Sequence, residues 1–163
     1  AAGVRRLAIF NRDVARARAL AGVLRGHEPA GGAEAPGVRA SGEAVPQPLS
    51  PSWQAVVEAF PLDGPELDAR LATCELLVNT TSVGMRPGER ILRPEQVPAH
   101  ALVVDIIYRP AETALLADAR ARGARTQNGL PMLVYQAAGA FERWIGQAPP
   151  LDVMFAAARQ ALA

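Results

Sequence analysis

Four short apolar segments of this sequence run directly into polar side chains that can donate or accept hydrogen bonds. The clearest case is the apolar run at residues 76–78, after which four small polar residues follow without a break. In open α/β sheets, ligands bind beyond the carboxyl ends of the strands, so we expect the four polar ends to form one binding cleft. The residues at these ends are Asn11 and Arg12; Asn79, Thr80, Thr81 and Ser82; Asp105 and Tyr108; and Asn128 and Gly129.

Strand and helix patterns alternate along the chain, and several of the strands are apolar throughout. This arrangement is typical of a parallel sheet with helices on both faces, so we expect a doubly wound α/β fold in one domain spanning residues 1–163. The predicted strands are 7–10, 53–60, 76–78, 101–107 and 125–127, and the predicted helices are 13–24, 65–73, 112–122, 131–145 and 151–162.

Composition excludes several classes of function. The chain has 163 residues, of which half are apolar and 20% are charged, and its net charge of +1 gives no strong attraction to nucleic acid or to an anionic membrane. No apolar run approaches the roughly 18 residues that span a bilayer, and no signal peptide is visible. A single cysteine, Cys74, fits a reducing, cytoplasmic compartment, and the two histidines lack metal-ligand spacing.

Residues 26–52 differ in composition from the rest of the chain. They are rich in Gly, Pro, Ala and Ser and offer little to bury. We therefore expect a flexible insertion that carries no chemistry of its own.

The first polar end indicates which dinucleotide would bind. In a nucleotide-binding sheet, arginine at the end of the second strand suits an adenosine 2′-phosphate, whereas an acidic residue suits a free 2′-hydroxyl. Arg12 lies at the strand end and Arg16 lies one helical turn further on, so both guanidinium groups can reach one phosphate. The pattern favours NADP over NAD, provided that the Asp13 carboxylate is turned into the helix cap. The alternative is an ordinary solvated arginine face.

An ordered set of motifs resembles the C-terminal, cofactor-binding half of shikimate dehydrogenase. NRDVAR resembles the NRTxxR motif of that family, with Asp13 in place of Thr or Ser. The segments at 79–85 (NTTSVGM), 105–110 (DIIYRP) and 128–138 (NGLPMLVYQAA) resemble three further family motifs in the same order. The resemblance runs from residue 1 to about 155 and implies a Rossmann-like fold. The insertion at 26–52 is longer than the family's usual connection.

The resemblance also implies roles for individual residues. Asn11, Arg12 and Arg16 would hold the 2′-phosphate of NADP. The path of the ribose and nicotinamide would be lined by Thr80, Ser82, Met85, Ile106, Gly129 and Met132. Tyr108 and Gln136 would reach the substrate, for which a phenol and a carboxamide are suitable partners.

The catalytic groups of the family are absent from this sequence. All 17 basic residues are arginine, whereas the family uses a lysine–aspartate pair from an N-terminal substrate domain. The glycine-rich turn of the first Rossmann strand is also missing. We therefore expect a fragment truncated at its N-terminus, with no catalytic residue of its own, weak NADP binding, and an open sheet edge that favours association, for example as a homodimer.

Three alternatives stay open at this point. The enzyme could act on quinate with NAD, for which Asp13 is the argument. The chain could be a non-catalytic dinucleotide-binding module, which the absence of lysine favours. It could also be a structural α/β domain whose polar strand ends are only caps and turns.

Overall fold

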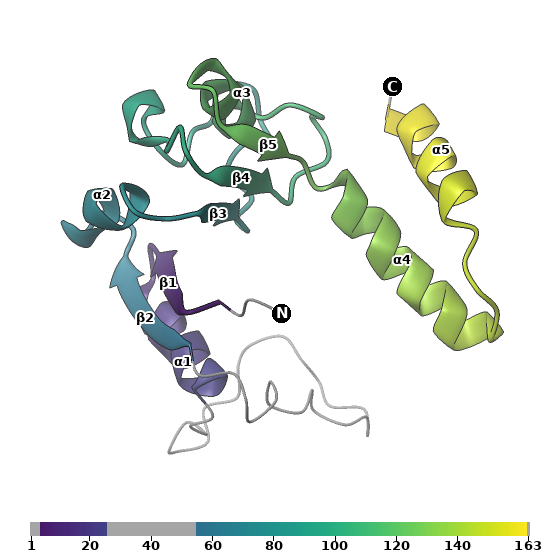
Figure 1. The fold of residues 1–163 in the computed structure, drawn as a ribbon, viewed down its shortest axis with the longest axis horizontal. Helices are drawn as coiled ribbons and strands as arrows, with labels where there is room; N and C mark the ends of the chain where they lie inside the picture. The colour runs from purple at the N-terminus through teal and green to yellow at the C-terminus, as the bar shows by residue number, and fades with distance from the viewer. Residues whose placement is uncertain (1–3, 26–54, 163) are drawn as a thin grey trace. The chain divides into compact units, whose positions relative to one another are not determined.

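The computed structural model describes residues 4–25 and 55–162, so the predicted insertion at 26–52 lies outside the described residues. The chain divides into two compact units, Ala1–Arg70 and Leu71–Ala163 (Figure 1). The elements, in order, are β1 (Arg6–Asn11), α1 (Val14–Leu24), β2 (Val56–Pro61), α2 (Glu66–Leu71), β3 (Leu76–Asn79), a short 3-10 helix (Pro94–Gln96), β4 (Leu102–Asp105), α3 (Ala114–Ala121), β5 (Arg125–Gln127), α4 (Leu130–Ile145) and α5 (Leu151–Leu162).

The first unit is a parallel strand pair covered by a helix. β1 pairs with β2 so that Arg6 lies opposite Val56 and Asn11 opposite Pro61. α1 connects the two strands and buries its small residues Ala17 and Ala21 in this unit. Short side chains on the buried face let a helix approach a sheet closely, so α1 and the strand pair form a thin two-layer structure.

The second unit contains a three-stranded parallel sheet in the order β3-β4-β5 (Figure 1). Leu76 lies opposite Leu102, and Leu102 lies opposite Arg125. α3 packs against β4 and β5, and α4 and α5 pack against each other. The buried apolar residues of this unit are Leu71, Leu92, Val97, Ala101, Val103, Ile107, Leu115, Leu116, Ala119, Val134 and Ala138.

The ends of the helices follow from residues that the sequence offers. The Thr113 hydroxyl accepts a hydrogen bond from the Leu116 amide and caps α3. Pro131 lies in the first turn of α4, and Gly146 ends that helix at a φ of 71°. The helices predicted at 13–24, 131–145 and 151–162 are therefore confirmed within one residue at either end.

The predicted α/β class with parallel strands is confirmed, but the described strands pair within two sheets instead of one. The two-stranded sheet is β1-β2 and the three-stranded sheet is β3-β4-β5. Within residues 4–25 and 55–162, no helix is both long and apolar enough to cross a bilayer.

Candidate functional site

Three of the four polar strand ends meet at one edge of the second unit's sheet. The strands are parallel, so the carboxyl ends of β3, β4 and β5 point the same way. Asn79 and Asp105 are opposite each other in register, and the Ile106 amide donates to the Asn79 carbonyl at 3.1 Å. The Gly129 amide donates to the Ile107 carbonyl at 3.0 Å. These backbone bonds join three of the four polar ends that the sequence predicts to form one cleft.

The loop after β3 is wrapped around the buried amide of Asn79. The Asn79 Nδ2 atom donates to the Val83 carbonyl at 3.0 Å, and its Oδ1 atom accepts from the Thr81 amide at 3.0 Å and from the Thr81 hydroxyl at 2.8 Å. Thr81 thus forms hydrogen bonds within the loop, although it is exposed. Thr80 and Ser82, the two hydroxyl residues predicted to contact a cofactor, are exposed on either side of it.

The end of this loop is a tight turn that presents Met85. Gly84 has a φ of 113°, a conformation that side-chain-bearing residues rarely adopt. The Glu89 carboxylate accepts from the amides of Gly84 and Arg86 at 3.1 and 3.3 Å and closes the turn. Met85 is 59% exposed.

The segment after β4 begins with a fully buried carboxylate. Asp105 has no exposed surface and accepts three hydrogen bonds, from the Asn79 amide, the Ile107 backbone and the Thr113 hydroxyl. Ile106 is partly buried, and Tyr108 is 39% exposed. From the sequence, Asp105 is expected as a strand-end carboxylate beside Tyr108 that could orient the loop, and its burial comes from the packing of α3 over β4.

The turn from β5 into α4 requires glycine at position 129. A Cβ atom on Gly129 would lie 1.8 Å from the Ile106 carbonyl oxygen. Gly129 is itself buried, so it shapes the floor of this edge and offers little surface to a ligand. Met132 and Gln136 follow on α4 and are both exposed.

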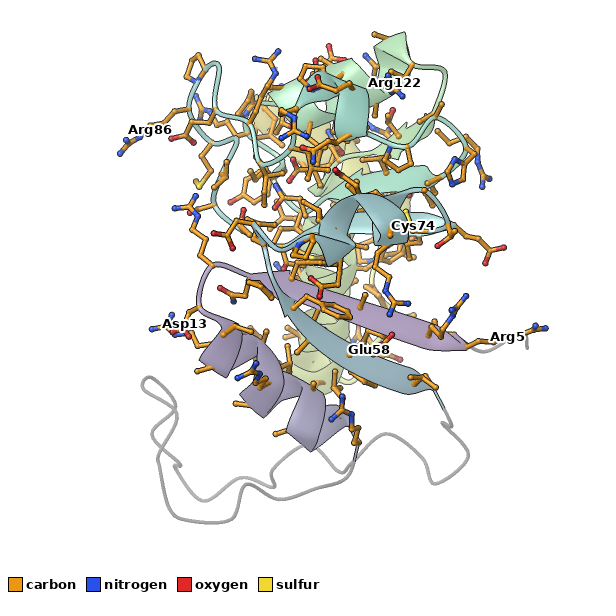
Figure 2. The ribbon with its side chains drawn as sticks, turned by 90° about the vertical axis from the view of Figure 1, so that its left-hand side faces the viewer. Arg5, Asp13, Glu58, Cys74, Arg86 and Arg122 are labelled. Atoms are coloured by element: carbon orange, nitrogen blue, oxygen red, sulfur yellow. The ribbon has the colours of Figure 1, made fainter. Side chains whose placement is uncertain are left out.

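The fourth polar end lies on the first unit, between β1 and α1. Asp13 caps α1, because its Oδ1 atom accepts from the amides of Ala15 and Arg16 at 3.0 and 3.3 Å (Figure 2). Asn11 supports the same turn by accepting from the Asp13 amide at 2.9 Å. Arg12 and Arg16 are exposed beside the cap. One oxygen of the Asp13 carboxylate is therefore turned into the helix cap, as a phosphate at this end would require, while the other oxygen lies 3.3 Å from the Arg16 Nε atom.

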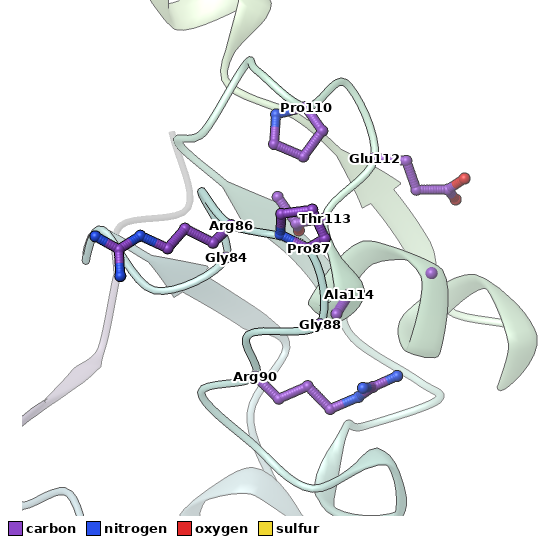
Figure 3. Close-up of a pocket in the computed structure, with 10 residues that line it drawn as sticks. Gly84, Arg86, Pro87, Gly88, Arg90, Pro110, Glu112, Thr113 and Ala114 are labelled. Carbon is purple, nitrogen blue, oxygen red and sulfur yellow. The ribbon is translucent and has the colours of Figure 1, made fainter.

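A separate hollow of about 280 Å³ lies between the loop after Met85 and the start of α3 (Figure 3). The hydrogen bond and the charge of Asp118 hold Arg90 at its rim and raise the pKa of that guanidinium. Arg86 points away from the hollow (Figure 3). The residues that line it are Gly84, Arg86, Pro87, Gly88, Arg90, Pro110, Glu112, Thr113, Ala114 and Ala117. Only Gly84 and Pro110 among them come from the motifs discussed above, and no side chain predicted to contact a ligand opens into it.

Sequence reasoning missed one member of the buried network, Thr113. The position of a threonine directly before an apolar helical pattern is the usual signal for a helix cap and could have identified it. In the part of the chain that the structure describes, no group of three His, Cys, Asp or Glu side chains could hold a metal ion.

Comparisons of sequence give one family. The model of the shikimate 5′-dehydrogenase C-terminal domain matches residues 129–159. The NADP(+) shikimate dehydrogenase of Symbiobacterium thermophilum is 43% identical over 164 residues, covering 99% of this chain and 48% of the relative. The enzyme of the same name from Geobacillus kaustophilus is 50% identical over 91 residues, covering 55% of this chain and 33% of the relative. The chain therefore spans a third to a half of the length of these relatives.

Comparisons of structure agree. Shikimate 5-dehydrogenase from Listeria monocytogenes, solved with shikimate and NAD, superposes with a TM-score of 0.72 at 27% identity and covers 93% of this chain and 46% of its own. Quinate dehydrogenase from Corynebacterium glutamicum, solved with NAD, gives a TM-score of 0.69 at 28% identity, with coverage of 94% and 45%. In sequence and in fold, the chain matches the C-terminal part of the shikimate dehydrogenase family, which confirms the resemblance carried by its motifs.

Proposed function

We propose that this chain is the NADP-binding part of a shikimate dehydrogenase, an oxidoreductase that reversibly reduces 3-dehydroshikimate to shikimate in the biosynthesis of aromatic amino acids through chorismate. The observation that carries the proposal is the edge of the β3-β4-β5 sheet, where three motif loops meet and leave Ser82, Met85 and Tyr108 exposed. The named relatives support the same function.

The residues at the start of α1 fit the adenosine end of NADP. Arg12 and Arg16 are exposed guanidinium groups one helical turn apart, and a guanidinium can donate two parallel hydrogen bonds to a phosphate. Asp13 is engaged by the helix amides, so one of its oxygens is withdrawn from the phosphate. Asn11 would complete this end by fixing the turn that carries both arginines.

The residues at the edge of the second unit's sheet fit the nicotinamide end. Bound NADPH supplies the hydride, and the protein holds the ring in place. Thr80 and Ser82 would donate to the ribose, and Met85, Ile106 and Met132 would pack against the ring. Gly129 would keep the floor flat beneath it, because any side chain there would strike Ile106.

Tyr108 and Gln136 would contact the substrate. Both side chains are exposed, on the segments that follow β4 and β5. A phenol and a carboxamide can both donate and accept, which suits a polyhydroxylated acid. We assign no catalytic residue to this chain, so proton transfer would belong to the rest of the enzyme.

The proposal is tested by calorimetric titration of the chain with NADP and with NAD. We expect weak binding of NADP, weaker binding of NAD, and no NADP reduction when shikimate is added to the chain alone. Binding of neither dinucleotide would contradict the proposal. Robust turnover by the chain would contradict the assignment of catalysis to other residues.

An NAD-dependent quinate or shikimate dehydrogenase is the second candidate. Its support is Asp13, together with a structural neighbour that is a quinate dehydrogenase solved with NAD. Turnover of quinate and shikimate with each dinucleotide, measured on the full-length enzyme, separates the two candidates. Preference for NAD and quinate would favour this one.

A non-catalytic dinucleotide-binding module is the third candidate, and a purely structural domain is the fourth. The variants Tyr108→Phe and Gln136→Ala, introduced into the full-length protein, test the structural role. Unchanged kinetics in these variants would support the structural role. A native protein of the present length that binds NADP without turnover would support the binding module.

We also propose a cytoplasmic location and self-association, for example as a homodimer. Among the described strands, β1 pairs only with β2, so its other edge can accept a further strand. Light scattering of the purified chain tests the association, and a monodisperse monomer would contradict it.

A further inference from the structure

We infer that Asp105 is a positioning residue, which fixes the loop at 79–85 against the segment that carries Ile106 and Tyr108. The inference rests on the proposed function, because both segments are assigned there to the cofactor and the substrate. Asp105 touches neither ligand in this assignment. It acts through the backbone and through two other side chains.

The geometry places Asp105 at the junction of three elements. Its Oδ1 atom accepts from the Asn79 Nδ2 atom at 3.2 Å, at the end of β3, and from the Ile107 amide at 3.1 Å, just beyond β4. Its Oδ2 atom accepts from the Thr113 hydroxyl at 2.7 Å, at the cap of α3. One carboxylate thus connects the start of the 79–85 loop, the approach to Tyr108 and the first turn of α3.

The burial of this carboxylate argues that its position is specified. Asp105 has no exposed surface, and no arginine of the described residues forms an ion pair with it. A buried carboxylate is costly unless donors satisfy both oxygens, and here three neutral donors do so. An apolar side chain would fill the same volume at lower cost but would hold none of the three partners.

The effect of Asp105 passes into the loop through Asn79. The Asn79 amide uses both of its donors and both acceptor positions, on Asp105, Val83 and Thr81. Since Asp105 accepts a hydrogen bond from Nδ2, only one orientation of the Asn79 amide also satisfies its hydrogen bonds to Val83 and Thr81. That orientation holds the Thr81 amide and hydroxyl on Asn79, whereas the adjacent residues Thr80 and Ser82 are exposed and make no bond to the Asn79 amide.

The test uses substitutions within this hydrogen-bond network. Thr113→Val keeps the shape of the side chain but removes the hydroxyl that donates to Asp105 and also caps α3, while Thr113→Ser keeps both bonds and serves as the matched control. Asp105→Asn keeps an acceptor for Asn79 and Ile107, and Asp105→Ala removes it. If Asp105→Ala does not fold, Thr113→Val still decides the question.

The first measurement needs no ligand. Amide hydrogen exchange, followed by NMR on the full chain, should accelerate at Thr81, Val83 and Ile107 in Thr113→Val and Asp105→Ala. It should stay unchanged in Thr113→Ser and throughout β1. Unchanged exchange at the three amides in Thr113→Val would overturn the inference, whether or not the chain binds NADP.

The second measurement is the dissociation constant for NADP. We expect this constant to rise about tenfold in Thr113→Val, because removing a residue that supports a ligand contact typically weakens affinity on this scale. In Thr113→Ser and Asp105→Asn we expect a rise of less than about threefold. Faster exchange with unchanged affinity would reduce Asp105 to a structural residue and overturn its positioning role. Failure of the parent chain to bind NADP would overturn the proposed function, while the exchange data would still decide whether Asp105 holds the loop.

Discussion

The Asp13 Oδ2 atom lies 3.3 Å from the Nε atom of Arg16, while the other oxygen of the same carboxylate caps α1. Asp13 therefore has two functions that can be separated. The capping oxygen stabilises the helix, and the second oxygen competes with a phosphate for the Arg16 guanidinium. The side chains of Arg16 and Asp13 are 74% and 52% exposed, so solvent weakens the ion pair but does not remove the competition.

Asp13→Ser should strengthen NADP binding. A serine hydroxyl can still cap α1, and Arg16 is released for the 2′-phosphate. We expect the NADP dissociation constant to fall about two- to fivefold, the range of an exposed ion pair, while the NAD constant stays unchanged. Titration calorimetry measures both. As a control, Asp13→Ala also releases Arg16 but removes the cap, so it should lower the free energy of unfolding by about 1 kcal/mol. A gain in NAD affinity instead would contradict the assignment.

Arg12→Ala and Arg16→Ala should each weaken NADP binding about tenfold, because each removes charged hydrogen bonds to one phosphate. NAD has no such phosphate, so its affinity should change little. Arg18→Ala is the matched control, since Arg18 lies two residues beyond Arg16 on the same helix and faces another direction. Equal losses in all three variants would indicate a general charge effect and contradict a specific phosphate site. Raising the salt concentration should reduce the difference between parent and variants.

The Cys74 thiol should react slowly for a cysteine. Burial raises its pKa, and this effect outweighs the opposing contribution of its backbone hydrogen bond. Less thiolate is therefore present at about pH 8 than in an unfolded chain, and alkylation by iodoacetamide should be slower in the native protein than in urea. The pKa of Cys74 is higher in the folded state than in the unfolded state. The contribution of Cys74 to the free energy of unfolding is therefore complete below the unfolded-state pKa and is lost as the pH rises through the folded-state pKa. Equal alkylation rates with and without urea would contradict the burial.

The sequence predicted most elements because their signals are local. Asp13 precedes an apolar helical pattern and Gly146 follows one, so these two helix ends could be located from neighbouring residues alone. The outward position of Met85 and Tyr108 also follows from their place beyond strand ends. Strand pairing depends on contacts between distant segments. No single segment of the sequence therefore encodes the division into two sheets.

The buried network could be predicted only in part, because it depends on packing between distant segments. Asn79 and Asp105 can each be recognised as a polar residue at a strand end. Nothing in the sequence near either residue shows that these two side chains, 26 positions apart, form a hydrogen bond. Thr113 joins them only because α3 covers β4. The close approach of Gly129 to the Ile106 carbonyl likewise depends on packing between distant segments, so the sequence alone does not show it.

Gly129→Ala should destabilise the second unit more than any other small substitution in α4. The new Cβ atom would lie 1.8 Å from the Ile106 carbonyl oxygen and 2.3 Å from its carbon, so the backbone beyond β4 or that of the turn must move. Because neither atom belongs to a flexible side chain, we expect a loss of about 3 kcal/mol or more in the free energy of unfolding, measured with urea.

Gly139→Ala is the control for that experiment. Gly139 lies within α4, and a Cβ atom there would meet nothing within 4 Å. Alanine is the better helix former, so this variant should gain about 0.5–1 kcal/mol. Opposite signs for the same chemical change in one helix and its cap would show that the Ile106 contact decides the effect. If Gly139→Ala lowered the free energy of unfolding as much as Gly129→Ala does, this account would be contradicted. The steric contact at residue 129 would then not explain the difference expected between the two positions.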